Sequence, residues 1–369
     1  MRARTRKKIL ILCPSPRGTA ATQRLKYEQY LELLASEGYT FHISAFQTRR
    51  FWKIIYRDGR TLEKIFWTVF GYLRRALDLA RSPFYDGVFV NLWVTPLGLP
   101  VFERMLFLFN RRVIYDIDDM IFMPRFEHVK ENIFQKLKGK KKPLILMKHA
   151  RYVIACTPQL TDIAAKRNKF GNAVDISSTL NTDRFRPPER QSEKYPVVLG
   201  WTGTHSSFAF LRTLAPVLKR VCASRRVELL VIANKVFSLD GLEITSIPWR
   251  EETEVRDLHR IDIGLYPIPA NDYSLGKSSL KALTYMSVGI PVVATAYGAN
   301  FRVIHDGVEG FLAKDEDEWF EKIIRLIDNP GLRKQMGRAG RERVQREFSV
   351  EANFPKYMQV FKAVINGNG

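Results

Sequence analysis

The sequence predicts an α/β chain with two doubly wound, parallel-sheet domains. Short apolar runs of strand length alternate with stretches of helical periodicity, as in sheets whose strands are buried on both faces. This alternation restarts after a polar, proline-containing stretch at residues 183–194, and a length of 369 residues exceeds what one hydrophobic core usually supports. We therefore predict an N-terminal domain over residues 1–190 and a C-terminal domain over 191–348, followed by a terminal segment at 349–369.

Each predicted strand is an apolar run of four to six residues. In the first half these runs lie at 8–13, 39–44, 87–92, 113–117 and 152–155. In the second half they lie at 197–201, 227–232, 242–246, 263–266 and 291–294, with helices expected at 208–220 and 278–288. Parallel sheets bind ligands at the carboxyl ends of their strands, so we expect the active site in a crevice that the two domains share.

The charge is distributed unevenly. Against 38 Asp and Glu the chain has 59 Lys and Arg, a net charge of +21, and the first 190 residues alone carry a net +18. Such a basic half predicts an anionic partner: nucleic acid, an acidic membrane surface or a phosphate-bearing substrate. Cys13, Cys156 and Cys222 are far apart, which favours neither a disulfide framework nor a zinc site and fits a reducing cytoplasm. We find no signal-peptide core and no apolar run of the roughly 20 residues that a spanning helix needs.

The most informative segment is 271–296, where a helix is expected to begin near Gly276. A glycine permits a close backbone turn, serines can cap, and the free amides of a first helical turn attract a diphosphate. From spacing alone, an ordinary capped helix with two surface lysines is an equal interpretation. The candidate donor-binding residues of this segment are Gly276, Lys277, Ser278, Ser279 and Lys281.

Together with residues 200–204 and 305–312, this segment resembles the donor-binding domain of glycosyltransferase family 4. Residues 15–18 resemble the family's N-terminal glycine loop, residues 180–185 resemble the segment before its linker, and Tyr-Asp-Ile-Asp-Asp at 115–119 resembles a bacterial branch. The resemblance implies the GT-B fold, in which two Rossmann-like domains face each other across a cleft. It also implies that residues 349–369 form a helix that crosses back to the N-terminal domain.

The resemblance further implies a retaining transfer of a sugar from a nucleotide-sugar donor, without a metal or other cofactor. Many relatives carry two glutamates eight positions apart on the donor helix, and the matching positions here are Gly276 and Thr284, so both carboxylates are absent. Thr284 offers the ribose only a hydroxyl. Lys277 and Lys281 are expected to add compensating charge at the diphosphate.

Two further segments of the second domain supply candidate donor ligands. Gly203 permits close approach of the loop after the first strand of this domain, and Thr204 and His205 there can donate to phosphate oxygens. Trp249 and Arg250 follow another strand and are candidates to contact the base. The structural alternatives are a plain connecting loop and a partly buried packing tryptophan.

In the first domain, three carboxylates follow a predicted strand. The resemblance places Asp118 and Asp119 where many relatives have a His-Asp pair, so they are the candidate catalytic residues, as acceptor base or oxocarbenium stabiliser. Alternation along the strand puts Asp116 on the same face as Asp118 and makes it a candidate cleft residue. The alternatives are a metal-binding Asp-x-Asp of the other large glycosyltransferase fold, or helix caps and salt bridges.

The turn after the first strand adds cations to the expected crevice. Arg17 and Gly18 lie in this turn and Arg24 on the following helix. Fixed arginines that face a departing nucleoside diphosphate stabilise the transition state more than the ground state. Arg24 is also compatible with a surface role.

Residues 49–81 combine an apolar helical stripe with aromatic and basic side chains, and residues 136–142 add five lysines. The base-rate interpretation is a helix that covers the sheet and exposes a basic side. The mixture also fits a protein lying on an anionic bilayer, so we expect peripheral association with the inner face of the cytoplasmic membrane and a cell-envelope acceptor.

Three other functions are alternatives to sugar transfer. A sugar-nucleotide epimerase has the same two-domain architecture. A nucleic-acid-binding protein explains the charge, but no such module is apparent and we expect no nucleic-acid partner. A dinucleotide oxidoreductase needs Gly-x-Gly-x-x-Gly after its first strand, which residues 15–20 lack.

Overall fold

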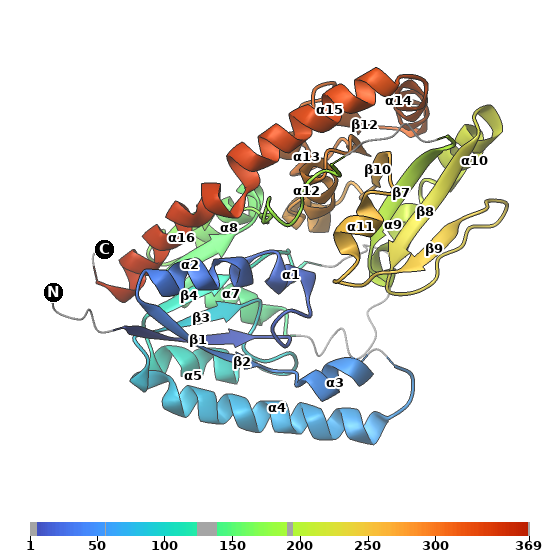
Figure 1. Cartoon of the computed structure of the whole chain (residues 1–369). Coiled ribbons are helices and arrows are strands. Elements are labelled where there is room, and N and C mark those ends of the chain that lie inside the picture. Colours follow the sequence, from blue (N-terminus) through green and yellow to red (C-terminus); the bar gives the residue numbers. More distant parts are fainter. Residues whose placement is uncertain (1–5, 56, 124–138, 190–194, 368–369) are drawn as a thin grey trace. The chain divides into compact units, whose positions relative to one another are not determined.

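The computed structural model describes residues 6–55, 57–123, 139–189 and 195–367, which form two compact units (Figure 1). Unit 1 comprises the chain up to Ser178 together with residues from Asn353 onward, and unit 2 runs from Thr179 to Ala352. Part of the predicted linker, residues 190–194, lies outside the described residues. So do residues 136–138 of the lysine-rich segment.

Unit 1 is built on a parallel sheet with the strand order β2-β1-β3-β4-β5-β6. Its central strands are apolar and buried on both faces, which is why they appear in the sequence as continuous hydrophobic runs. The strands are β1 (Lys7–Cys13), β2 (Tyr39–Ala45), β3 (Gly87–Asn91), β4 (Val113–Asp116), β5 (Tyr152–Ala155) and β6 (Ala173–Asp175).

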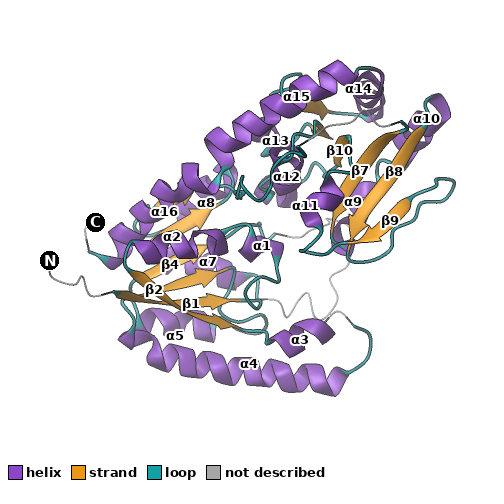
Figure 2. Cartoon of the chain, viewed as in Figure 1, coloured by secondary structure: helices purple, strands orange, loops and turns teal. Residues whose placement is uncertain are grey.

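Helices cover both faces of this sheet (Figures 1 and 2). One layer contains α4, α5, α7 and α8, which pack beside one another in that order. On the other side α16 packs on unit 1 through aromatic contacts, including Tyr357 stacked on Tyr30 with ring centroids 4.0 Å apart. The helices are α1 (Ala21–Arg24), α2 (Leu31–Ser36), α3 (Arg49–Ile54), α4 (Thr61–Arg81), α5 (Val101–Phe109), α7 (Lys141–His149), α8 (Pro158–Arg167) and α16 (Val350–Ile365).

Helix α4 buries polar side chains and exposes its apolar stripe, the reverse of an ordinary amphipathic helix. Its buried positions are Gly71, Arg75, Asp78 and Leu79. Arg75 is fully buried and donates hydrogen bonds to the carbonyls of Cys13, Ser44 and Val94, and it is ion-paired with Asp78 at 3.0 Å. The apolar stripe faces outward instead: Leu62, Ile65, Phe66, Val69, Phe70, Leu73 and Leu77 are all 40–83% exposed. The base-rate interpretation, in which this stripe covers the sheet, is therefore wrong.

Unit 2 repeats the architecture, with the strand order β12-β11-β10-β7-β8-β9, all parallel. Its core joins β7, β10 and β11 to α10, α14 and α15. The strands are β7 (Val197–Gly203), β8 (Val227–Ala233), β9 (Thr245–Pro248), β10 (Ile263–Tyr266), β11 (Val292–Thr295) and β12 (Gly310–Ala313). The helices are α9 (Phe208–Arg212), α10 (Ala215–Ser224), α11 (Glu254–Leu258), α12 (Leu280–Ser287), α13 (Asn300–Val303), α14 (Glu316–Asp328) and α15 (Pro330–Arg343).

The two parallel sheets confirm the predicted α/β class, with local differences. Strands β6 and β12 were not predicted; they are short, with three and four residues. The strand expected at 242–246 lies at Thr245–Pro248, since Leu242 instead closes a turn with Leu239. The helix expected at 208–220 is divided into α9 and α10, and a proline lies in the first turn of α10.

Candidate functional site

Two of the predicted donor-site residues, Gly203 and Lys281, lie together at the carboxyl ends of β7 and β10. Gly203 ends β7, and a Cβ added there would lie 2.5 Å from the Trp201 ring and 2.8 Å from Cε of Lys281. The ammonium of Lys281 lies 5.6 Å from the centroid of Trp201 and 5.5 Å from that of Tyr266, the last residue of β10. The structure therefore brings the predicted Gly203 and Lys281 together and adds two aromatic rings that sequence reasoning did not select.

The start of α12 differs from the expected capped helix. Gly276 ends a 3₁₀ turn, Asp272–Gly276, and α12 begins only at Leu280. Ser279 at the N-cap position has a left-handed φ of 58°, and its hydroxyl donates to Oδ1 of Asn300 at 2.6 Å. Ser279, at the N-cap position, makes no capping hydrogen bond through its side chain, so the predicted cap by Ser279 is wrong.

Lys277 lies in the short connection between the 3₁₀ turn and α12. Its ammonium donates to the Tyr273 hydroxyl at 3.2 Å and lies 4.6 Å from the centroid of the same ring. In the sequence, Lys277 precedes and Lys281 follows Leu280, the first residue of α12, so both ends of this short segment carry a positive charge. This arrangement suits a diphosphate, because charge-assisted contacts are the stronger class of hydrogen bond.

The two positions that match the family glutamates are buried. Thr284 is 6% exposed, and its hydroxyl donates to the carbonyl of Leu280 at 2.8 Å, within its own helix. Gly276 is also buried. The Thr284 hydroxyl is thus already used by the backbone, which disfavours the ribose contact expected of it.

Tyr285 supports the end of β7 through a contact that the sequence did not reveal. The Thr202 amide donates to the Tyr285 hydroxyl at 2.8 Å, so Tyr285, on α12, holds the end of β7 in place. Gly264 on β10 makes room for this ring, since a Cβ there would lie 2.5 Å from it. Burial raises the pKa of Tyr285 well above its usual range, which keeps the hydroxyl protonated. Its signal in the sequence, one tyrosine among apolar helix positions, does not distinguish this role from packing.

The loop after β7 is held by its own polar groups. The His205 amide donates to Oδ1 of Asn234 at 2.7 Å, and the hydroxyls of Thr204 and Ser206 are 2.8 Å apart. The His205 amide is therefore already bonded to Asn234, the residue that follows β8. Thr204 is exposed, so its hydroxyl is the donor that best fits the predicted phosphate contact.

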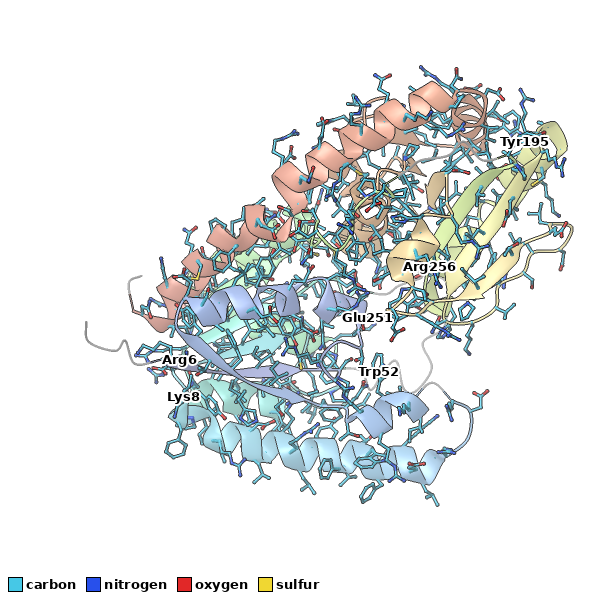
Figure 3. The ribbon with its side chains drawn as sticks, viewed as in Figure 1. Arg6, Lys8, Trp52, Tyr195, Glu251 and Arg256 are labelled. Atoms are coloured by element: carbon cyan, nitrogen blue, oxygen red, sulfur yellow. The ribbon has the colours of Figure 1, made fainter. Side chains whose placement is uncertain are left out.

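Trp249 and Arg250 lie apart from the group at β7 and β10. They follow β9, the edge strand, which is separated from β7 by β8. Trp249 donates its indole N–H to Glu254 at 3.2 Å, and Arg184 pairs with Glu254 at 3.1 Å and with Glu251, which is labelled in Figure 3. Trp249 therefore belongs to a cluster with Glu254 and Arg184 at this edge of the sheet.

In unit 1, Asp116 is a buried structural carboxylate rather than a cleft residue. Asp116 is fully buried and pairs with the ammonium of Lys26 at 2.7 Å, and it accepts a hydrogen bond from Asn91 at 2.9 Å. The same ammonium donates to the carbonyl of Ile117 at 3.0 Å. Burial opposes the charge of Lys26, but the Asp116 carboxylate, together with Cys156 and Asp118, more than offsets this and raises the pKa of Lys26. The expected cleft role of Asp116 is therefore wrong.

Asp118 and Asp119 follow β4, which ends at Asp116. The alternation of side chains along a strand therefore does not assign Asp118 and Asp119 to opposite faces of the sheet. The carbonyl of Asp118 accepts a hydrogen bond from the Cys156 thiol at 2.9 Å, and its side chain is 7% exposed. Asp119 is half-buried, and its carbonyl closes a tight turn with the Ile121 amide. Of the two predicted catalytic carboxylates, Asp119 is the more exposed.

The turn after β1 is organised by two side chains from the next helices. Gly18 has a φ of +80°, and its amide donates to Glu28 at 2.9 Å. Gln23 bonds both the amide and the carbonyl of Ser15. Burial raises the pKa of Glu28, and the Gly18 and Gln23 hydrogen bonds and the charges of Arg17 and Arg24 partly oppose this.

Arg17 and Arg24 differ in exposure. Arg17 is exposed, whereas Arg24 is 6% exposed, so the surface role considered for Arg24 does not apply. The positive charges of both guanidinium groups stabilise the Glu28 carboxylate. This carboxylate fixes the turn by accepting a hydrogen bond from the Gly18 amide. Of the two arginines, Arg17 is the one whose side chain is accessible to a ligand.

The described residues hold neither a cluster of metal ligands nor a membrane-spanning helix. No group of three or more His, Cys, Asp or Glu side chains in this part of the chain is arranged to hold a metal ion. None of the helices that the structure describes has the length and apolarity needed to cross a membrane.

Comparison with known proteins identifies the class of unit 2. Residues 198–329 match the model of the family described as "Glycosyl transferases group 1" and so form a domain of that type. A 76-residue segment is 33% identical to the trehalose synthase of Pyrococcus horikoshii, and a 103-residue segment is 36% identical to the human alpha-1,3/1,6-mannosyltransferase ALG2. These segments cover 21% and 28% of this chain but only 18% and 24% of the relatives' own lengths.

Solved structures match over nearly the whole chain. The sucrose-phosphate synthase of Thermosynechococcus elongatus superposes with a TM-score of 0.71, covering 98% of this chain and 100% of that one at 17% identity. Anabaena Alr3699/HepE, solved in complex with UDP and glucose, superposes with a TM-score of 0.66, covering 97% and 100% at 14% identity. At such identities the similarity shows the fold, and the fold is GT-B.

Proposed function

We propose that this chain is a retaining glycosyltransferase of family 4 that moves a sugar from a nucleotide-sugar donor to a cell-envelope acceptor. The supporting observation is the group 1 match over residues 198–329, within which Gly203 and Lys281 lie together at the strand ends where parallel sheets bind ligands. The acceptor is a lipid-linked sugar, a lipopolysaccharide or a polysaccharide.

The donor diphosphate is bound by Lys277 and Lys281. Negative charge grows on the diphosphate as the glycosidic bond breaks, and fixed cations placed there stabilise the transition state. Tyr266 and Trp201 limit the positions open to Lys281. Because the relative Alr3699/HepE is described in complex with UDP-glucose, a UDP-sugar is the first donor to test.

The lysines supply the positive charge that a divalent cation supplies in other transferases, so we propose that transfer needs no metal or other cofactor. Activity in excess EDTA should equal activity in Mg²⁺. A loss of more than about 10-fold that Mg²⁺ restores would contradict this.

Asp119, with Asp118 beside it, is the proposed acceptor base or oxocarbenium stabiliser. Removing such a carboxylate costs about 10²–10⁴-fold in rate. Asp119→Asn should therefore lower kcat by at least about 100-fold and leave the urea midpoint of unfolding unchanged, because its side chain is only half-buried. Equal kcat in the variant would remove Asp119 from the mechanism.

Donor binding tests the central assignment. Thermal-shift screening with UDP-, GDP- and TDP-sugars should find one that stabilises the protein, by about 2.7 kcal/mol at 100 times its Kd. Lys281→Ala and Lys277→Ala should each weaken that sugar about 10- to 100-fold, the worth of a charge-assisted contact. Arg338→Ala on the exposed side of α15 is the matched control and should keep the full shift.

Product analysis separates transfer from epimerisation. A transferase releases nucleoside diphosphate in proportion to glycosylated acceptor, whereas an epimerase yields an epimer or free sugar with no acceptor present. Formation of the epimer alone would favour the second function.

We also propose that the outward face of α4 attaches the protein peripherally to the inner, anionic face of the cytoplasmic membrane. The seven exposed apolar side chains of α4 form a stripe along the 21-residue helix, and Figure 3 shows side chains projecting from α4 away from the sheet. Arg57, Arg60 and Arg81 flank this stripe and are exposed. An apolar face bordered by cations fits an anionic bilayer, because the apolar side chains enter the interface and the cations contact the headgroups.

Liposome flotation tests this attachment. Wild-type protein should float with vesicles containing phosphatidylglycerol, and less so in high salt, since each cation contributes only about 1 kcal/mol. Phe66→Glu combined with Leu73→Glu should reduce binding by at least about 100-fold, because two large side chains together contribute about 3–6 kcal/mol. Val236→Glu combined with Val308→Glu, at sites 83% and 51% exposed in unit 2, is the matched control. Equal flotation of both variants would refute the assignment of α4.

A further inference from the structure

Unit 1 contains a cavity of about 760 Å³ between α5, α7 and the segment that leads into β6. This volume lies within the roughly 300–1,000 Å³ of ordinary ligand pockets. Helix α5 connects β3 to β4, and the cavity is lined by the last turns of α5 and α7. It therefore lies toward the amino-terminal edge of the sheet, opposite the edge where Asp118, Asp119 and Arg17 follow their strands.

The cavity is strongly cationic. Arg104, Arg111 and Lys169 line it together with His149. No carboxylate of the described residues forms a salt bridge with any of these three cations. Burial lowers the pKa of His149, and Lys169, Lys148 and Arg104 lower it further. A site whose cations repel one another and have no counter-ion among the described residues is complementary to an anion.

The rest of the lining is apolar. Phe107 packs against the His149 ring with centroids 5.4 Å apart, and the Lys169 ammonium lies 5.0 Å from the Phe170 centroid. Ile145 and Leu108 complete the wall, and Leu108 is 81% exposed. A ligand that satisfies this cavity therefore has an anionic group and an adjoining hydrocarbon part.

The structure assigns this cavity as a binding site for the phosphate group of an anionic lipid, with the first carbons of its acyl chains against Phe107 and Leu108. Helix α5 also packs beside α4, where Tyr72 and Phe102 make an edge contact at 5.6 Å. That the ligand is a membrane lipid rests on the membrane contact proposed for α4. The site itself depends on neither sugar transfer nor the donor.

The His149 resonances report binding directly in the full-length protein. His149→Gln identifies them among the six histidines. Dihexanoylphosphatidic acid, a soluble lipid, should shift them saturably and raise the pKa of His149, because a bound phosphate replaces repulsion with attraction. Inorganic phosphate should bind at least about 10-fold more weakly, since it lacks the hydrocarbon part. Absence of a saturable shift with the lipid would overturn the proposal, and equal affinity for both ligands would overturn the lipid assignment.

Paired variants locate the binding. Arg104→Gln with Lys169→Gln should weaken the soluble lipid at least about 10-fold, the loss expected from charge-assisted contacts. Lys219→Gln with Arg338→Gln removes the same charge from exposed positions of unit 2 and should change the affinity less than about 2-fold. Equal losses in the two variants would show non-specific charge attraction and refute the site. Because donor sugars are absent from these titrations, the result is independent of whether the chain is a transferase.

Discussion

Replacing Asp116 by Asn should destabilise unit 1 severely, because it leaves the Lys26 charge buried without its counter-ion. Both side chains are at most 1% exposed, and their charged atoms are 2.7 Å apart. Removing one partner of such a pair costs about 3–5 kcal/mol. For a unit of this size that corresponds to a fall in Tm of roughly 6–20 °C, at about 2–4 °C per kcal/mol.

Urea unfolding of Asp116→Asn, Lys26→Met and the double variant measures the coupling. The double variant should be more stable than the sum of the two single losses by at least about 2 kcal/mol, since it no longer buries an unpaired charge. The exposed pair Arg220–Asp317 is the control, and Asp317→Asn there should cost less than about 1 kcal/mol.

The pH dependence follows from the direction of the Lys26 shift. Because the folded-state pKa of Lys26 is raised, its stabilisation is complete below the ordinary lysine pKa of about 10.4 and is lost only as pH rises through the folded value. The difference between wild type and Lys26→Met should therefore be constant near neutral pH. An Asp116→Asn variant that unfolds like wild type but loses activity would refute this reasoning and return Asp116 to the active site.

Three shorter predictions follow from local geometry. Gly203→Val should abolish donor binding in calorimetry with the stabilising sugar, because even a Cβ at this position overlaps the neighbouring indole at 2.5 Å. Of the three cysteines only Cys222 is exposed, so Ellman's reagent should modify it in the native protein and reach the two buried thiols only after unfolding. Burial opposes the charge of Glu309, but hydrogen bonds from Arg343 and the His305 amide lower the pKa of this carboxyl. The contribution of Glu309 to stability is therefore present above the ordinary glutamate pKa and is lost as pH falls through the folded-state pKa. In a profile of urea midpoint against pH, Glu309→Gln should flatten the decline below about pH 4.3.

The fold was predictable where the sequence pattern is local. Buried parallel strands appear as uninterrupted apolar runs, and the strands at residues 152–155 and 263–266 have the bounds that were predicted. Boundaries that depend on backbone conformation were not predictable. The first helical residue of α12 is Leu280 rather than Gly276 because Ser279 adopts a left-handed φ that its hydrogen bond to Asn300, on another helix, stabilises.

The candidate site was predictable in part for the same reason. Gly203 and Lys281 belong to motifs, and the structure brings them together. The buried Lys26 has no local signature, since its partner Asp116 is 90 positions away and a lysine ordinarily indicates a surface position. A pattern of residue types along the chain does not record which charges the fold will bury together. The predicted domain boundaries and the expected active-site crevice stay predictions.

Helix α4 shows the limit of periodicity most directly. The spacing of its apolar residues predicts a stripe but does not state which side of the helix faces the sheet. The decision is made by Arg75, whose guanidinium satisfies three carbonyls and Asp78 inside unit 1 and so holds the polar side inward. Arg75→Leu should therefore leave those carbonyls and Asp78 unsatisfied and destabilise the unit by about 3–5 kcal/mol, although it makes the buried side more apolar. A variant more stable than wild type would show that α4 tolerates either orientation, and the exposed stripe would then lose its significance as a membrane-binding face.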